Sequence, residues 1–205
     1  MDYFLGRLTK QILHAAQILE KAVIDGNVIN VIIKQNVSLL EGVVSRGRRY
    51  IGQNSIIDNG ALVANLVIGE GCMVGYGTEI KHCYIGDKCW FHQNCFGDSI
   101  IGNDCSSGGR MFTANLRQDE RDTSVRVGRE EIDIGVNKLG TLMGDGVRTG
   151  INVSLMPGVR VGAGCFVGPH VCLSHELVVR KMALPAGDYS VANNAEKIGG
   201  LICVE

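Results

Sequence analysis

The sequence predicts an all-β protein whose chain coils into a parallel β-helix, and three features of the pattern support this fold class. A large or branched residue recurs every six positions near the C-terminal end, at Met143, Thr149, Leu155, Val161, Val167 and Leu173. A second small or branched residue follows four positions later, at Val147, Val153, Val159, Cys165, Val171 and Leu177. Glycine directly follows several members of the first series, at Gly144, Gly150, Gly162 and Gly168. This six-residue period fits neither a helix nor a hairpin and indicates short parallel strands joined by sharp corners.

The same frame occurs upstream of residue 143. It reads I-G-Q-N-S-I from residue 51, I-G-E-G-C-M from 68, I-G-D-K-C-W from 85 and I-G-N-D-C-S from 101. Three such sides make a triangular coil, and successive coils stack one strand spacing apart, about 4.8 Å. We therefore expect residues 28–178 to form one continuous array of hexapeptide repeats.

Different patterns flank the array. Residues 1–27 are expected to hold an amphipathic α-helix, because apolar residues recur at spacings of three and four, at Phe4, Leu8, Ile12, Ala15, Leu19 and Val23. Such a helix would cover the open end of the array, which otherwise exposes an unpaired strand edge. Residues 179–205 are expected to form an irregular tail or a final strand.

The repeat breaks between residues 115 and 142, where the sequence is long and charged. An insertion of this length in a compact array is expected to protrude, and such loops often carry function. Within it, T-S-V-R-V followed by G-R-E-E-I-D-I predicts a small hairpin.

Composition limits the classes of partner. The 205 residues carry a formal net charge of −1, which gives no electrostatic reason to expect nucleic acid or an anionic membrane as partner. We also expect no signal peptide and no membrane-spanning segment, because no apolar stretch approaches about 20 residues. The eight cysteines include no CxxC pair, and we expect most to be buried free thiols of a cytoplasmic protein.

The residues around the insertion resemble a known family. The segments H-Q-N-C-F-G-D-S-I-I-G from residue 92, G-G-R-M-F-T-A-N-L-R-Q-D from 108, and K-L-G-T-L-M-G-D-G-V-R-T-G-I-N-V-S-L-M-P-G from 138 carry the resemblance. They are similar to the C-terminal half of archaeal-type bifunctional sugar-1-phosphate nucleotidylyltransferases, which is an amino-sugar-phosphate acetyltransferase built from hexapeptide repeats. The chain lacks the G-x-G-T-R-M start of the other half, so we expect no pyrophosphorylase activity.

This resemblance implies a left-handed β-helix, a homotrimer and acetyl-CoA as the acyl donor. The acceptor would be an amino-sugar phosphate or a nucleotide sugar. Cys95 and Arg121 depart from the family pattern, which has tyrosine and lysine there, and Ser106 stands where the bacterial relatives have asparagine. Two alternatives therefore stay open: a non-catalytic scaffold or regulatory partner of a separate nucleotidylyltransferase, and acyl transfer to a different acceptor. In the repeat frame, Cys95 falls at the small inward position four after Phe91, and His92, one after Phe91, is expected to face outward.

The resemblance also implies roles for individual residues. His92 would be the general base, because an imidazole titrates near neutral pH; the alternative is a solvated surface histidine. Asn115, Arg117 and Arg121 would contact the substrate, and both guanidiniums suit a phosphate; the alternative for these three is a corner asparagine and a solvated charged loop.

The same resemblance places the coenzyme along the later coils. There it would pass Gly109, Ile151 and Gly168, although simple corner packing explains these residues equally well. No metal is expected, because the histidines of the array, His170 and His175 among them, do not match the spacing of zinc-binding β-helix enzymes.

Overall fold

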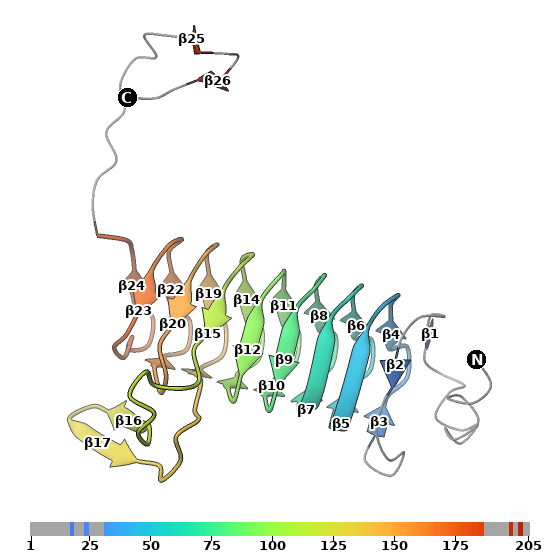
Figure 1. Ribbon diagram of the computed structural model, residues 1–205, viewed down its shortest axis with the longest axis horizontal. Helices are drawn as coiled ribbons and strands as arrows, with labels where there is room; N and C mark the ends of the chain where they lie inside the picture. Colours follow the sequence, from blue (N-terminus) through green and yellow to red (C-terminus); the bar gives the residue numbers. More distant parts are fainter. Residues whose placement is uncertain (1–16, 19–22, 25–30, 187–196, 199–200, 203–205) are drawn as a thin grey trace.

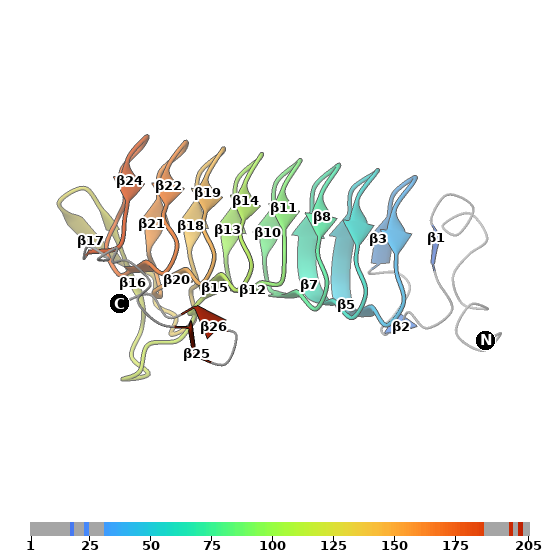
Figure 2. The ribbon, with the colours of Figure 1, turned by 90° about the horizontal axis from the view of Figure 1, so that it is seen from above.

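The computed structural model describes residues 17–18, 23–24, 31–186, 197–198 and 201–202. Every regular element within these ranges is a β-strand. The strands stack coil upon coil into a long three-sided prism that winds in the left-handed sense (Figures 1 and 2). The predicted fold class, a left-handed parallel β-helix of hexapeptide repeats, is thereby confirmed. No helix in the described ranges could cross a membrane.

One face of the prism, which we call face A, is a nine-stranded parallel sheet. Its strands follow the chain in order at one strand per coil: β1 (Gln17–Ile18), β4 (Ser38–Leu39), β6 (Ile56–Ile57), β8 (Met73–Val74), β11 (Trp90–Phe91), β14 (Ser106–Ser107), β19 (Arg148–Thr149), β22 (Phe166–Val167) and β24 (Met182–Ala183). The last strand lies beyond residue 178, so the array continues past its expected end.

A single 13-stranded sheet forms the other two faces. Face B contains β2 (Val23–Ile24), β9 (Glu79–Lys81), β12 (Cys95–Gly97), β15 (Phe112–Thr113), β20 (Ser154–Leu155) and β23 (Cys172–Leu173). Face C contains β3 (Val31–Ile33), β10 (Tyr84–Ile85), β13 (Ile100–Ile101), β18 (Leu142–Met143) and β21 (Arg160–Val161). Two long strands, β5 (Val44–Ile51) and β7 (Leu62–Ile68), bend around the edge and belong to both faces. We name the prism edges A/B, B/C and C/A after the faces they join.

The expected N-terminal helix falls mainly outside the described residues. The four described residues within it form β1 and β2, which pair in parallel with β4 and β5, so the prediction is wrong at those positions. The β-branched pair Val23 and Ile24 favours a strand, and pairing there continues the sheet beyond the first full coil.

The interior is a column of apolar side chains, one from each side of each coil. The six-residue series of the sequence points inward as expected, since Met143, Leu155, Val161 and Val167 are each at most 4% exposed. Five cysteines are also buried inside as free thiols: Cys72, Cys83, Cys89, Cys105 and Cys165. The predicted buried thiols are confirmed for these residues, whereas Cys172 is exposed and Cys203 lies outside the described residues.

The insertion leaves the prism at the B/C edge, between β15 and β18. Its strands β16 (Ser124–Val127) and β17 (Glu130–Asp133) pair antiparallel, which confirms the predicted hairpin (Figure 1). Near the C-terminus, β25 (Lys197–Ile198) and β26 (Leu201–Ile202) form a second antiparallel pair.

Candidate functional site

His92 lies on the A/B edge, directly after β11. The preceding Phe91 fills the interior at 0% exposure, so the alternation of the strand turns His92 outward, as predicted. Its ring centroid lies 6.5 Å from that of Trp90, and its backbone N–H donates to the Ser107 carbonyl of the next coil. The imidazole is therefore exposed and open to a bound molecule.

The three residues expected near the coenzyme lie on this same edge. Phe91 pairs with Ser107, Ser107 with Thr149, and Thr149 with Val167, so the positions that follow them stack in successive coils. Gly109, Ile151 and Gly168 therefore line the edge beyond His92. A β-carbon added to Gly109 would meet nothing within 4 Å, and Ile151 is 52% exposed, so the surface here is open.

A shallow pocket of about 270 Å³ adjoins His92 on face B. It is lined by Gly77, Glu79, Gln93, Asn94, Cys95, Arg110 and Phe112. Cys95 was expected to point inward, but the buried residue of β12 is Phe96, and Cys95 faces this pocket. Burial, and then the Glu79 charge, raise the pKa of the Cys95 thiol, which therefore stays protonated and is a poor nucleophile at neutral pH.

Asn115 lies on a different edge. It follows β15 at the B/C edge, where its side-chain N–H donates to the Asp98 carboxylate. An added β-carbon on Gly97 would lie 2.8 Å from the Asn115 amide nitrogen, so the glycine leaves room for the Asn115 side chain. The structure therefore does not bring Asn115 and His92 together within one chain.

Arg117 and Arg121 differ in their surroundings. Arg117 donates two hydrogen bonds, of 2.8 and 2.7 Å, to Asp119. This guanidinium holds the pKa of the Asp119 carboxyl well below its usual range. Arg121 lies 4.0 Å from the same carboxylate with 82% of its side chain exposed. Arg117 is thus fixed in position, whereas Arg121 is largely in solvent.

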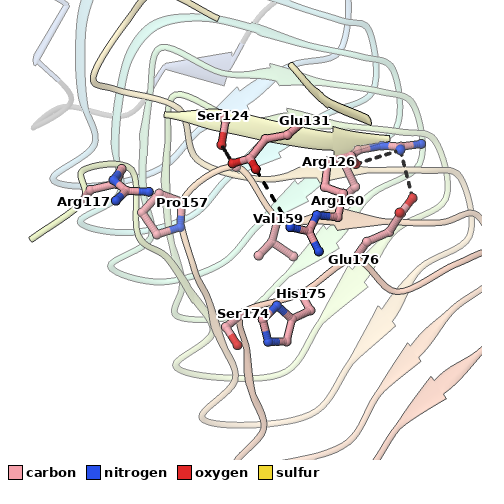
Figure 3. A pocket seen from close by; sticks show the side chains of 11 residues that line it. Arg117, Ser124, Arg126, Glu131, Pro157, Val159, Arg160, Ser174, His175 and Glu176 are labelled. Carbon is pink, nitrogen blue, oxygen red and sulfur yellow. Dashed lines mark hydrogen bonds and ion pairs between the residues drawn. The ribbon is translucent and has the colours of Figure 1, made fainter. Parts of the chain in front are cut away.

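Arg117 also lines a polar pocket of about 180 Å³ between the hairpin and the prism (Figure 3). The hairpin contributes Ser124, Arg126 and Glu131, and the coils contribute Pro157, Gly158, Val159, Arg160, Ser174, His175 and Glu176. Three guanidiniums and two carboxylates line this pocket, and the Asp119 carboxylate paired with Arg117 makes the formal charges equal. We call this the arginine pocket.

Internal pairing orients the guanidiniums of the arginine pocket. Arg160 lies 2.9 Å from Glu176 and donates to the backbone carbonyl of Arg126 at 3.1 Å, while Arg126 lies 3.9 Å from Glu131. These contacts join the hairpin to the coils and hold the Arg126 and Arg160 guanidiniums in place. Sequence reasoning missed Arg126 and Arg160, because they are 34 residues apart and only the folded insertion makes them neighbours.

Comparison with known proteins gives the class to which this architecture belongs. The family model for bacterial transferase hexapeptide (six repeats) matches residues 140–175. The chain is 31% identical to the uncharacterized acetyltransferase YaiX of Escherichia coli O6:K15:H31 over 185 residues, which is 89% of this chain and 77% of that protein. The family model names the hexapeptide repeat, and the relative is an acetyltransferase that matches most of the chain. The chain belongs to the hexapeptide-repeat acyltransferase family.

Other relatives match over shorter shares of their length. The bifunctional protein GlmU of Methanocaldococcus jannaschii is 39% identical over 112 residues, covering 54% of this chain and 27% of that protein. The chain thus spans about a quarter of this relative's length. Among solved structures, the UDP-N-acetylglucosamine acyltransferase from Campylobacter jejuni is 15% identical with a TM-score of 0.42, covering 82% of this chain and 69% of that one.

Proposed function

We propose that the protein is an acetyl-CoA-dependent acyltransferase that acts on an amino-sugar phosphate or a nucleotide sugar. The observation that supports this most is the A/B edge, where His92 and the three expected coenzyme residues lie in line. From the coil of His92 to that of Gly168 there are three coil spacings, or about 14 Å at 4.8 Å each. An extended pantetheine chain can follow such a straight edge. The buried free thiols suit a reducing cytoplasmic compartment.

The proposed chemistry assigns one proton transfer to His92. The acceptor amine attacks the thioester carbonyl carbon, His92 takes the proton from nitrogen, and the carbon–sulfur bond breaks. The coenzyme thiolate then receives the proton. The pocket beside His92 holds the amine end of the acceptor, and its Glu79 and Arg110 supply polar contacts.

We propose that the acceptor's phosphate binds at the B/C edge, where Asn115, Arg117 and Arg121 lie. Because His92 lies on the A/B edge, these groups act on one substrate only when the B/C edge of a neighbouring subunit adjoins the A/B edge. A homotrimer with sites between subunits meets this requirement by a closed cyclic arrangement. Outward apolar residues on the faces, such as Trp90, Phe112 and Phe166, would then be covered by neighbours.

Replacing Arg117 with alanine is expected to raise KM for a phosphorylated acceptor by about tenfold, because a charge-assisted contact contributes about 1.5–3 kcal/mol. Arg121→Ala should raise the same KM by less, since its side chain is mostly in solvent. Steady-state kinetics with phosphorylated and unphosphorylated forms of one amino sugar provide the measurement. An equal KM for Arg117→Ala and wild type on the phosphorylated form would remove the arginine from substrate binding.

The proposed function is tested first by calorimetric titration with acetyl-CoA. We expect micromolar binding at one site per subunit, and an acceptor screen with product detection by mass spectrometry would follow. No binding by a folded oligomer would contradict the acyltransferase proposal. That result would favour a scaffold or regulatory partner of a separate nucleotidylyltransferase.

A further inference from the structure

A ladder of corner residues runs along the B/C edge and reaches Asp98, the hydrogen-bond partner of Asn115. Gly47, Asn65, His82 and Asp98 occupy this corner in four successive coils, and all four have positive φ, at 67°, 49°, 53° and 46°. Asparagine, aspartate and histidine are the non-glycine residues found most often in this left-handed region. The side chains of Asn65, His82 and Asp98 lie along the edge and contact one another from coil to coil.

The backbone N–H of Arg48 determines which atoms donate and which accept hydrogen bonds along this ladder. The N–H of Arg48 donates to the Asn65 side-chain oxygen at 3.0 Å, so the other atom of that amide is the NH₂ donor. This NH₂ lies 3.4 Å from His82 Nε2, which must then accept. The proton of the neutral imidazole is therefore on Nδ1, which lies 3.3 Å from the Asp98 carboxylate.

Asp98 is held firmly as the partner of His82. Its second carboxylate oxygen accepts from Asn115, and its backbone N–H donates to the Lys81 carbonyl at 3.0 Å. Only 20% of the Asp98 side chain is exposed, against 56% for His82. A carboxylate on Nδ1 with Nε2 left as acceptor is the arrangement of an oriented general base. The long contact with Asn65 is easily displaced by a substrate group.

His82 opens onto a groove of about 790 Å³ on face C. Its wall is formed mainly by outward apolar residues of successive coils: Ile32, Tyr50, Val67, Tyr84, Ile100 and Leu139. These side chains stand side by side because their strands pair in register, from Ile32 opposite Tyr50 to Tyr84 opposite Ile100. A molecule bound here would meet this apolar surface and the His82 imidazole, with Arg48 and Arg49 also in the lining.

We propose that His82, positioned by Asp98, is the general base of a second acyl-acceptor site in this groove. The acceptor class is an amine or alcohol carried on an apolar or aromatic body. Its heteroatom bonds to the thioester carbonyl carbon, its proton passes to His82 Nε2, and the carbon–sulfur bond breaks. The thiolate of the leaving coenzyme then takes the proton from His82. The proposal rests on the proposed use of acetyl-CoA as acyl donor.

Within one chain, the His92 ring does not serve this groove, because it lies on the A/B edge whereas the groove lies beside the B/C edge. Among the described residues, no carboxylate contacts the His92 ring, whereas the Asp98 carboxylate lies 3.3 Å from His82 Nδ1. The two histidines therefore define separate sites on one chain.

The tautomer of His82 tests the dyad independently of any substrate. Long-range ¹H–¹⁵N NMR spectra of protein labelled at histidine nitrogen should show neutral His82 with its proton on Nδ1. Asp98→Asn should change the His82 signals, and asparagine keeps the left-handed backbone that position 98 requires. A wild-type proton on Nε2 would overturn the proposal.

Acetyl transfer to 2-phenylethylamine tests the second site itself. Wild type should acetylate this amine, and His82→Asn and Asp98→Asn should each lower kcat by about 10²-fold or more while KM changes little. Lys88→Asn is the matched control, because Lys88 is also a left-handed corner residue, is exposed, and lies on the C/A edge. Equal kcat for His82→Asn and wild type, or no acetylation by wild type, would overturn the proposal. Calorimetry with acetyl-CoA on the same samples shows whether a failure lies instead in the donor site.

Discussion

His92→Ala is expected to lower acetyl transfer to the amino-sugar acceptor by about 10²-fold or more, because it removes the group that takes the amine proton. The side chain is exposed and contributes no core packing, so the oligomer and its melting temperature should be unchanged. Initial rates should be measured by mass spectrometry of the acetylated product, because the cysteines of the chain would disturb thiol-detecting assays.

His92→Gln separates proton transfer from simple contact. Glutamine keeps a polar side chain of similar length but accepts no proton near neutral pH, so we expect a loss as large as that of alanine. Acetyl-CoA affinity should stay near the wild-type value in both variants. Turnover by His92→Ala equal to wild type would remove His92 from the mechanism, and high activity of His92→Gln alone would assign it to binding.

The predictable part of this protein is the part set by the repeat. Inward residues such as Ile85 and Ile101 recur in step with the coil, so the pattern alone predicted the strands, the core and the outward position of His92. Cys95 was misplaced because the chain loses one residue at this corner. The inward positions therefore fall one residue earlier than the simple frame implies, at Asn94 and Phe96. The six-residue repeat therefore predicts the coil of a residue more reliably than the direction of its side chain.

The candidate sites were only partly predictable, for a different reason. Residues on one edge, such as His92 and Gly168, share a place in the repeat and can be related by counting. Arg126 and Arg160 are brought together by a hairpin outside the repeat, so counting does not relate them. The pairing of His82 with Asp98 does follow from coil spacing, at 16 residues, but it requires knowledge that both are corner residues in the left-handed conformation.

Phe91→Ala is expected to lower the free energy of unfolding by about 3–5 kcal/mol, the usual loss for a buried aromatic residue. Its ring is 0% exposed and packs against Phe96 with centroids 4.6 Å apart. The neighbouring coils place Val74 and Ser107 opposite Phe91, so its removal leaves a cavity in the interior column.

Urea unfolding followed by circular dichroism at one fixed protein concentration measures this effect, since the stability of an oligomer depends on concentration. Phe91→Leu should lose less, because it leaves a smaller cavity. The matched control is Trp90→Ala on the same strand: Trp90 is 56% exposed, and its removal should change the free energy of unfolding of an isolated subunit by about 0.5 kcal/mol or less. A larger loss for Trp90→Ala than for Phe91→Ala would mean that contacts between faces of neighbouring subunits, rather than the interior column, hold this coil in place.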